Sequence, residues 1–158
     1  MHYLIRLIVE AANAEEAKLR ADTILTDLVE RHEIDWYHNG EEGSRWADCW
    51  KPMRLTTKKG KAVATEALSN QHQEFLWAMN AIRLMLERYT DEQILNEDFD
   101  QTTGHYFSRY HFTVAGGCGA NACYLFSLEG EQLSKQRELD RYLDDTEKYW
   151  IVQVDCHN

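Results

Sequence analysis

One stretch of the chain, from Gly104 to Phe126, concentrates histidine, cysteine, arginine and aromatic residues and alternates in polarity from His105 onward. Side chains along a strand point to opposite faces in turn, so this alternation predicts a β-hairpin. The glycines around Cys118 would make its turn. One hairpin face would be apolar and belong to the core, with Tyr106, Tyr110, Phe112 and Val114. The opposite face would carry His105, Arg109, His111 and Thr113, with Phe107 as its one apolar member.

The charge balance limits the partners that this chain can bind. Its 158 residues include 17 basic and 27 acidic side chains, which gives a net charge of −10. Nucleic acids and anionic membranes attract basic surfaces, so we expect no general nucleic-acid binding and no membrane binding. No segment approaches the roughly 20 apolar residues of a membrane span, and no basic region of signal-peptide type precedes the apolar N-terminal run. Four cysteines in a chain with enough apolar residues to fold without disulfides predict free thiols and a cytoplasmic location.

Hydrophobic periodicity predicts the other elements. Residues 2–10 alternate as a strand does, and Asn13 with Glu16 indicates a capping box for a helix that ends near His32. Residues 34–56 are rich in tryptophan but lack a sustained period, so we expect an ordered aromatic loop. A short helix capped by Thr90, a helix over 132–143 and a strand over 149–156 follow later in the chain. Between the aromatic loop and the helix capped by Thr90 lies a long helix, which begins after Thr56 or Thr57. It carries a core stripe of Leu68, Phe75, Met79, Ile82, Leu86 and Tyr89.

This order of elements predicts a single α+β domain over residues 1–158. We expect a four-stranded, mostly antiparallel sheet with helices packed on one face, a loosely ferredoxin-like arrangement. The other face would then be polar and open to solvent. Strand parity assigns to this face His2, Arg6, Glu10, His105, Arg109, His111, Thr113, Tyr149, Gln153, Asp155 and His157.

Two regions are candidate binding surfaces. Arginine donates two parallel hydrogen bonds to carboxylate or phosphate groups, so the polar face indicates a site for an anionic ligand or a partner. An ordinary solvated face of an antiparallel sheet would have the same composition. The aromatic loop offers the second surface. The candidate ligand- or partner-binding residues are Arg6, His105, Arg109, His111, Gln153, Trp46 and Trp50.

A catalytic interpretation rests on the tripeptide His111-Phe112-Thr113. It resembles one half of the paired motif of 2H phosphoesterases, in which two such histidines act as acid and base on a phosphodiester. The second copy is missing, because the tripeptides that begin at His2 and His105 lack the hydroxyl residue. Phosphate-ester chemistry by His111 and Thr113, with Arg109 nearby, is therefore the alternative.

Neither a metal nor a cofactor is expected. The soft ligands Cys118, Cys123, Cys156 and His157 lack the close spacing of structural zinc sites, and buried free cysteine is the simpler interpretation. A basic cluster over residues 51–61 lies at the start of the long helix, where a helix favours negative charge. It indicates either a nearby anion or compensation by the acidic residues Glu41, Glu42 and Asp48.

The sequence thus favours a small acidic, non-enzymatic binding, accessory or inhibitor protein. Its partner would be another protein or a small anionic ligand. Dimerisation is also expected, because an open sheet face or an unpaired edge at residues 2–10 or 149–156 needs a partner or protection.

Overall fold

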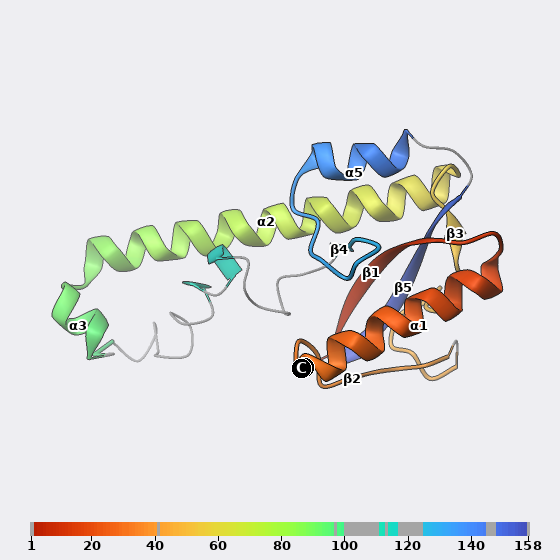
Figure 1. Cartoon of the computed structure of the whole chain (residues 1–158). Coiled ribbons are helices and arrows are strands. Elements are labelled where there is room, and N and C mark those ends of the chain that lie inside the picture. Colours follow the sequence, from red (N-terminus) through yellow and green to blue (C-terminus); the bar gives the residue numbers. More distant parts are fainter. Residues whose placement is uncertain are drawn as a thin grey trace. The chain divides into compact units, whose positions relative to one another are not determined.

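The computed structural model describes residues 2–40, 42–96, 98–99, 111–112, 114–116, 125–144 and 148–157 (Figure 1). The chain divides into two compact units, so the single domain expected from the sequence stays a prediction. The first unit comprises residues 1–71 and 123–158 and contains the sheet, and the second comprises residues 72–122. None of the helices in the described ranges is long and apolar enough to cross a membrane.

Two long strands from distant parts of the sequence form the centre of the sheet. β1 (His2–Glu10) pairs with β5 (Tyr149–His157) in antiparallel register over nine residues, from His2 opposite His157 to Glu10 opposite Tyr149. Both segments are rich in β-branched and aromatic residues, which favour strands. The alternation that predicted these strands is confirmed, and β5 extends one residue beyond its expected end.

Among the described residues, three short strands pair with these two. β2 (Trp36–Tyr37) and β3 (Met53–Arg54) both pair antiparallel with β5, while β4 (Leu125–Phe126) pairs parallel with β1. The order is β2-β5-β1-β4, with β3 also on β5, so the described part of the chain has an α+β fold with a mixed sheet of five strands. The ferredoxin-like arrangement and a mostly antiparallel sheet are not confirmed. The expected unpaired edge at β1 or β5 is wrong, because each of these strands has neighbours on both sides.

Local signals at the start of α1 (Ala14–Glu30) are confirmed. The Asn13 side chain accepts a hydrogen bond from the backbone N–H of Glu16 at 3.0 Å, and the Glu16 carboxylate accepts one from Ala12 N–H at 2.9 Å. Capping satisfies backbone donors that a helix leaves without internal partners. The buried face of α1 carries Ala17, Ala21, Leu25 and Leu28, at the spacing that the sequence indicated.

Helices cover both faces of the central strands, so the expectation of helices on one face only is wrong. Ile8 and its cross-strand neighbour Ile151 pack into one core cluster with Leu68 of α2 (Lys58–Arg88) and Leu139 of α5 (Gln136–Leu143). Residues of opposite parity on β1, such as Leu7, are also fully buried, and α1 contacts β1 and β5. Figure 1 shows α1 on one side of these strands and α5 on the other.

The expected hairpin is wrong over residues 111–116, where the described residues are helical. His111 and Val114, three residues apart, are buried, whereas Phe112 is 45 % exposed. Phe112 and Val114 therefore do not share a face, because a helix repeats every 3.6 residues and a strand every two. Residues 104–110 and 117–124, including His105, Arg109 and both hairpin cysteines, lie outside the described residues.

The second unit contains the later part of α2 and α3 (Asp91–Leu95). Thr90 and Gln93 form the predicted capping box of α3, with hydrogen bonds of 3.0 and 3.2 Å. Ala78 of α2 packs against Val114. The expected core stripe on α2 is only partly right: Leu68 in the first unit and Ile82 in the second are buried, but Phe75 and Leu86 are about half exposed, at 44 % and 58 %.

Two leucines on α1 test the core assignment. Leu25 is fully buried, whereas Leu19, on the same helix, is 66 % exposed. We expect Leu25→Ala to reduce the free energy of unfolding by about 2–5 kcal/mol, through lost burial and a residual cavity. The matched control Leu19→Ala should change it by no more than about 0.5 kcal/mol. Urea unfolding followed by circular dichroism gives both values, and equal losses would contradict the assigned orientation of α1.

Glu138 gives a test in acid. Its carboxylate accepts hydrogen bonds from the backbone N–H groups of Ser134 and Lys135, each at 3.1 Å, and the bond from Ser134 is the main cause that lowers its pKa. A carboxyl group whose pKa is lower in the folded than in the unfolded state stabilises the folded protein at pH values above the unfolded-state pKa. This stabilisation is lost as the pH falls through the folded-state pKa. We expect Glu138→Gln to be less stable than wild type at neutral pH, with the difference shrinking below about pH 4. A difference that stays constant in urea unfolding from neutral to acid pH would contradict this assignment.

Candidate functional site

The structure brings together two of the residues that the sequence assigned to a polar sheet face. Arg6 and Gln153 are cross-strand neighbours, and the Arg6 Nε donates a hydrogen bond to Gln153 Oε1 at 3.2 Å. The Arg6 guanidinium also lies 3.8 Å from a carboxylate oxygen of Glu66 on α2. However, Arg6 is only 5 % exposed and Gln153 only 7 %. The expected exposed polar face is therefore wrong at its centre, where the polar groups are buried and bonded to one another.

The aromatic loop, residues 34–56, packs against β5 beside these buried polar residues. Trp50 donates its backbone N–H to the Gln153 carbonyl at 3.0 Å, and the Arg45 backbone N–H donates to the Asp155 carboxylate at 2.8 Å. The Trp50 indole is buried and donates to the carbonyl of His38, so it does not offer a contact surface. Trp46 stays half-buried, with the Arg45 guanidinium 6.0 Å from its ring centre.

Two cysteines within this buried region are free and lie in a setting that keeps them protonated. Burial raises the pKa of the Cys49 thiol, and burial together with the Asp155 carboxylate raises the pKa of Cys156 far more. Only a thiolate is a good nucleophile or metal ligand. Burial therefore favours the protonated form of both thiols.

Two lysines of the basic cluster at the start of α2 are compensated by Asp48, which agrees in part with one of the two interpretations of the cluster. The Asp48 carboxylate lies 2.7 Å from the Lys59 ammonium and 3.9 Å from that of Lys51. The hydrogen bond from Lys59 is the main cause that lowers the pKa of Asp48. Arg54 lies over the Trp150 ring at 4.6 Å from its centre.

Two histidines at the end of the β1–β5 pairing reach the surface. His2 Nδ1 lies 3.0 Å from the buried carboxylate of Asp155, and His157 Nδ1 lies 3.4 Å from the carboxylate of Asp35. Trp36 is stacked on His157 with ring centres 5.2 Å apart, and both rings meet His2 edge-on. Strand parity assigned both histidines to the same face, but it gave no sign of Trp36, which comes from β2.

His111 occupies a different setting in the second unit. Its ring is fully buried, 4.3 Å from the ring centre of Trp77. A buried imidazole packed on an indole is typical of a core histidine rather than of an acid or base that meets a substrate in solution. Thr113 lies outside the described residues.

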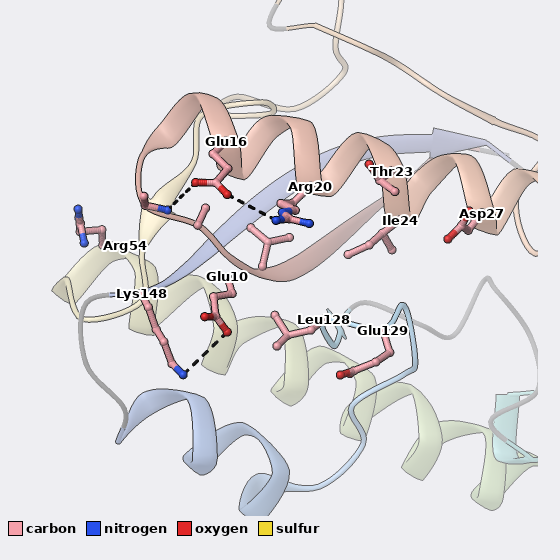
Figure 2. A pocket seen from close by; sticks show the side chains of 13 residues that line it. Glu10, Glu16, Arg20, Thr23, Ile24, Asp27, Arg54, Leu128, Glu129 and Lys148 are labelled. Atoms are coloured by element: carbon pink, nitrogen blue, oxygen red, sulfur yellow. Dashed lines mark hydrogen bonds and ion pairs between the residues drawn. The ribbon is translucent and has the colours of Figure 1, made fainter.

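A cleft of about 970 Å³ beside α1 was not anticipated from the sequence. Figure 2 shows charged side chains of α1 and of the chain near Glu129 around one space. Two ion pairs join residues of its lining: Glu16 with Arg20 at 3.6 Å, and Glu10 with Lys148 at 3.8 Å. It is lined by Val9, Glu10, Ala11, Ala12, Glu16, Arg20, Thr23, Ile24, Asp27, Arg54, Leu128, Glu129 and Lys148.

A helical pattern at positions 16, 20, 23, 24 and 27 could have revealed one wall of this cleft, because residues three and four apart share a helix face. In the sequence alone, that face of α1 has the composition of an ordinary solvated surface. Only the structure shows that Leu128 and Glu129 line the same cleft. Among the residues that the structure describes, no group of three or more histidine, cysteine, aspartate or glutamate side chains could hold a metal ion.

Two aspartates, each paired with a histidine, allow a matched test of the buried polar region. Asp155 is 2 % exposed and bonded to His2 and to the Arg45 backbone, whereas Asp35 is 61 % exposed. We expect Asp155→Asn to cost about 1.5–3 kcal/mol of unfolding free energy, since hydrogen bonds of a buried charged group are lost or weakened. Asp35→Asn should cost no more than about 1 kcal/mol. Urea unfolding measures both, and a small loss for Asp155→Asn would mean that its carboxylate is solvated.

Comparison with curated proteins gave no match, and comparison with solved structures gave none either. A family model described as a domain of unknown function (DUF7995) matches residues 1–158. Because this match spans the entire chain, the protein belongs to the DUF7995 family.

Proposed function

We propose that this chain is a small acidic, non-enzymatic binding protein, of the accessory or inhibitor kind, that recognises a protein partner through the cleft beside α1. The observation that carries the proposal is the lining of the cleft, which presents side chains of both charge signs around a space open to solvent. The polar sheet face no longer supports binding, because Arg6 and Gln153 are buried.

The charges in the cleft favour a polypeptide over a small anion. Its carboxylates come from Glu10, Glu16, Asp27 and Glu129, and its cations from Arg20, Arg54 and Lys148. Two of those cations, Arg20 and Lys148, already have carboxylate partners, so a small anion would meet a lining that is negative overall. A polypeptide segment with basic and acidic side chains can pair with both signs.

The size of the cleft does not separate the two kinds of ligand, but the positions of its cations favour binding. Pockets for small molecules occupy about 300–1,000 Å³, and this cleft, at about 970 Å³, lies at the upper end of that range. Two of its cations are held by aromatic rings: Arg54 lies 4.6 Å from the ring centre of Trp150, and Lys148 lies 4.7 Å from that of Tyr149. Side chains that are already positioned lose less conformational entropy on binding.

The net charge of −10 favours a partner with a basic surface. Opposite net charges steer two proteins together and raise the rate of association. The homodimer expected from the sequence has less support, because β1 and β5 each have a described strand on both sides and two acidic copies repel each other.

A cytoplasmic location is part of the proposal. Its support is that Cys49 and Cys156 are free thiols, as expected in a reducing compartment.

Phosphate-ester chemistry with His111 and Arg109 stays the alternative function. It has less support than binding, because His111 is fully buried against Trp77. Arg109 and Thr113 lie outside the described residues.

Site-specific cross-linking tests the proposed cleft. Thr23 lines the cleft, while Thr26 is exposed on the same helix and lies outside it. A benzoylphenylalanine at position 23, introduced into the protein in its natural host, is expected to cross-link one protein that the same group at position 26 does not. Equal cross-linking from both positions would contradict the cleft as the binding surface.

Affinity measurements with the captured and purified partner complete this test. We expect Arg20→Glu to weaken binding at least about tenfold, a loss of about 1.4 kcal/mol, and added salt to weaken the wild-type complex. Arg137→Glu is the matched control, because Arg137 is exposed on α5 and outside the cleft. Equal affinities for the two variants, or a small anion co-purified in native mass spectra with no protein captured, would overturn the proposal.

A further inference from the structure

In the second unit, the solvent side of α2 carries apolar side chains at positions where a helix usually carries polar ones. Ala78, Ile82 and Met85 form the buried side of this segment. Leu76 and Leu84 lie on the opposite side and are 51 % and 65 % exposed. Residues three, four and seven apart share a helix face. The exposed residues of this face, here named the outer face of α2, are Gln73, Leu76, Trp77, Asn80, Arg83, Leu84 and Glu87.

The outer face of α2 is arranged symmetrically about Asn80, so it is complementary to itself. When a second copy of α2 lies antiparallel to the first with the two Asn80 residues opposite each other, positions equally far before and after Asn80 meet. Leu76 of each copy then faces Leu84 of the other. The two central amides can each donate and accept a hydrogen bond, and an asparagine at the centre of a helix pair fixes its register. A twofold-symmetric interface requires a surface of this kind.

The charged residues favour the antiparallel over the parallel arrangement. A parallel pair would place Arg83 opposite Arg83 and Glu87 opposite Glu87, and like charges in contact are destabilising. The antiparallel pair places Glu87 opposite the amide of Gln73, and Arg83 opposite Trp77, where a guanidinium can lie against an indole. The segment 72–88 contains two acidic and two basic residues, so its own charges cancel although the whole chain carries −10.

We propose that this chain forms a twofold-symmetric homodimer through the outer face of α2, with the two helices antiparallel and centred on Asn80. Burial of Leu76 and Leu84 between the copies stabilises the dimer. The interface uses neither β1 nor β5. It also shares no residue with the cleft beside α1, so dimerisation is independent of the proposed function.

Sedimentation equilibrium of the untagged full-length chain at increasing concentrations tests the dimer. We expect the mean mass to rise from that of one chain towards that of two. Leu84→Glu places a carboxylate in the apolar contact and should raise the dissociation constant at least about tenfold. Leu19→Glu is the matched control, because Leu19 is 66 % exposed on α1 and should leave this constant unchanged. Circular dichroism confirms that each variant is folded.

Cross-linking between copies tests the register. The chain carries Cys118→Ser and Cys123→Ser, and its other thiols, Cys49 and Cys156, are buried. A single new thiol is added on the outer face and treated with bismaleimidoethane, a short reagent that joins two thiols. Asn80→Cys should give a covalent dimer, because position 80 lies opposite itself in the proposed pair.

The ends of the outer face distinguish antiparallel from parallel helices. In the proposed pair, position 87 lies opposite position 73, which is 14 residues along the helix from position 87 of the same copy. Two thiols at position 87 would then be about 21 Å apart. Glu87→Cys should therefore not cross-link to itself, whereas a mixture of Glu87→Cys and Gln73→Cys chains should cross-link.

Three results would overturn the proposal. One is the mass of a single chain at every concentration, which would mean that something other than a second copy covers the outer face of α2. Another is an equal effect of Leu84→Glu and Leu19→Glu on the dissociation constant. The third is efficient cross-linking of Glu87→Cys to itself, which would show that the helices are parallel.

Discussion

The antiparallel ladder between β1 and β5 is the interaction on which the rest of this structure depends. It joins nine residues near one end of the sequence to nine near the other, from His2 opposite His157 to Glu10 opposite Tyr149. Each remaining strand attaches to one of these two, since β2 and β3 pair with β5 and β4 pairs with β1. The core cluster around Ile8 and Ile151 is also built on a cross-strand pair of this ladder.

The ladder also accounts for the place of the cleft beside α1. In its middle, both faces are covered and polar groups such as Arg6 and Gln153 bond to each other rather than to a ligand. Only the two ends of the ladder reach solvent. One end presents His2 beside Trp36, and the other presents Glu10 paired with Lys148 at the margin of the cleft.

Local patterns in the sequence were sufficient to predict the structure where interactions between neighbouring residues determine it. The caps at Asn13 and Thr90 and the strand alternation at both ends are such cases, and parity correctly placed Arg6 and Gln153 on the same face of the sheet. Burial of that pair could not be predicted, because the aromatic loop attaches to β5 through backbone groups such as the Trp50 N–H, which leave no side-chain pattern. His111 was misplaced because it lies in a short, largely apolar run, and periodicity alone does not distinguish a helix from a strand in such a run.

The separation of the paired strands has a consequence for biosynthesis. A chain is made from its N-terminal end at about 5–20 residues per second, so the segment of β1 leaves the ribosome long before β5 exists. Ile5, Leu7 and Ile8 of the nascent chain then lack the partner strand that buries them in the finished protein. The sheet therefore cannot form until β5 has been synthesised, and in the interval the apolar side chains of β1 lack the strand that covers them.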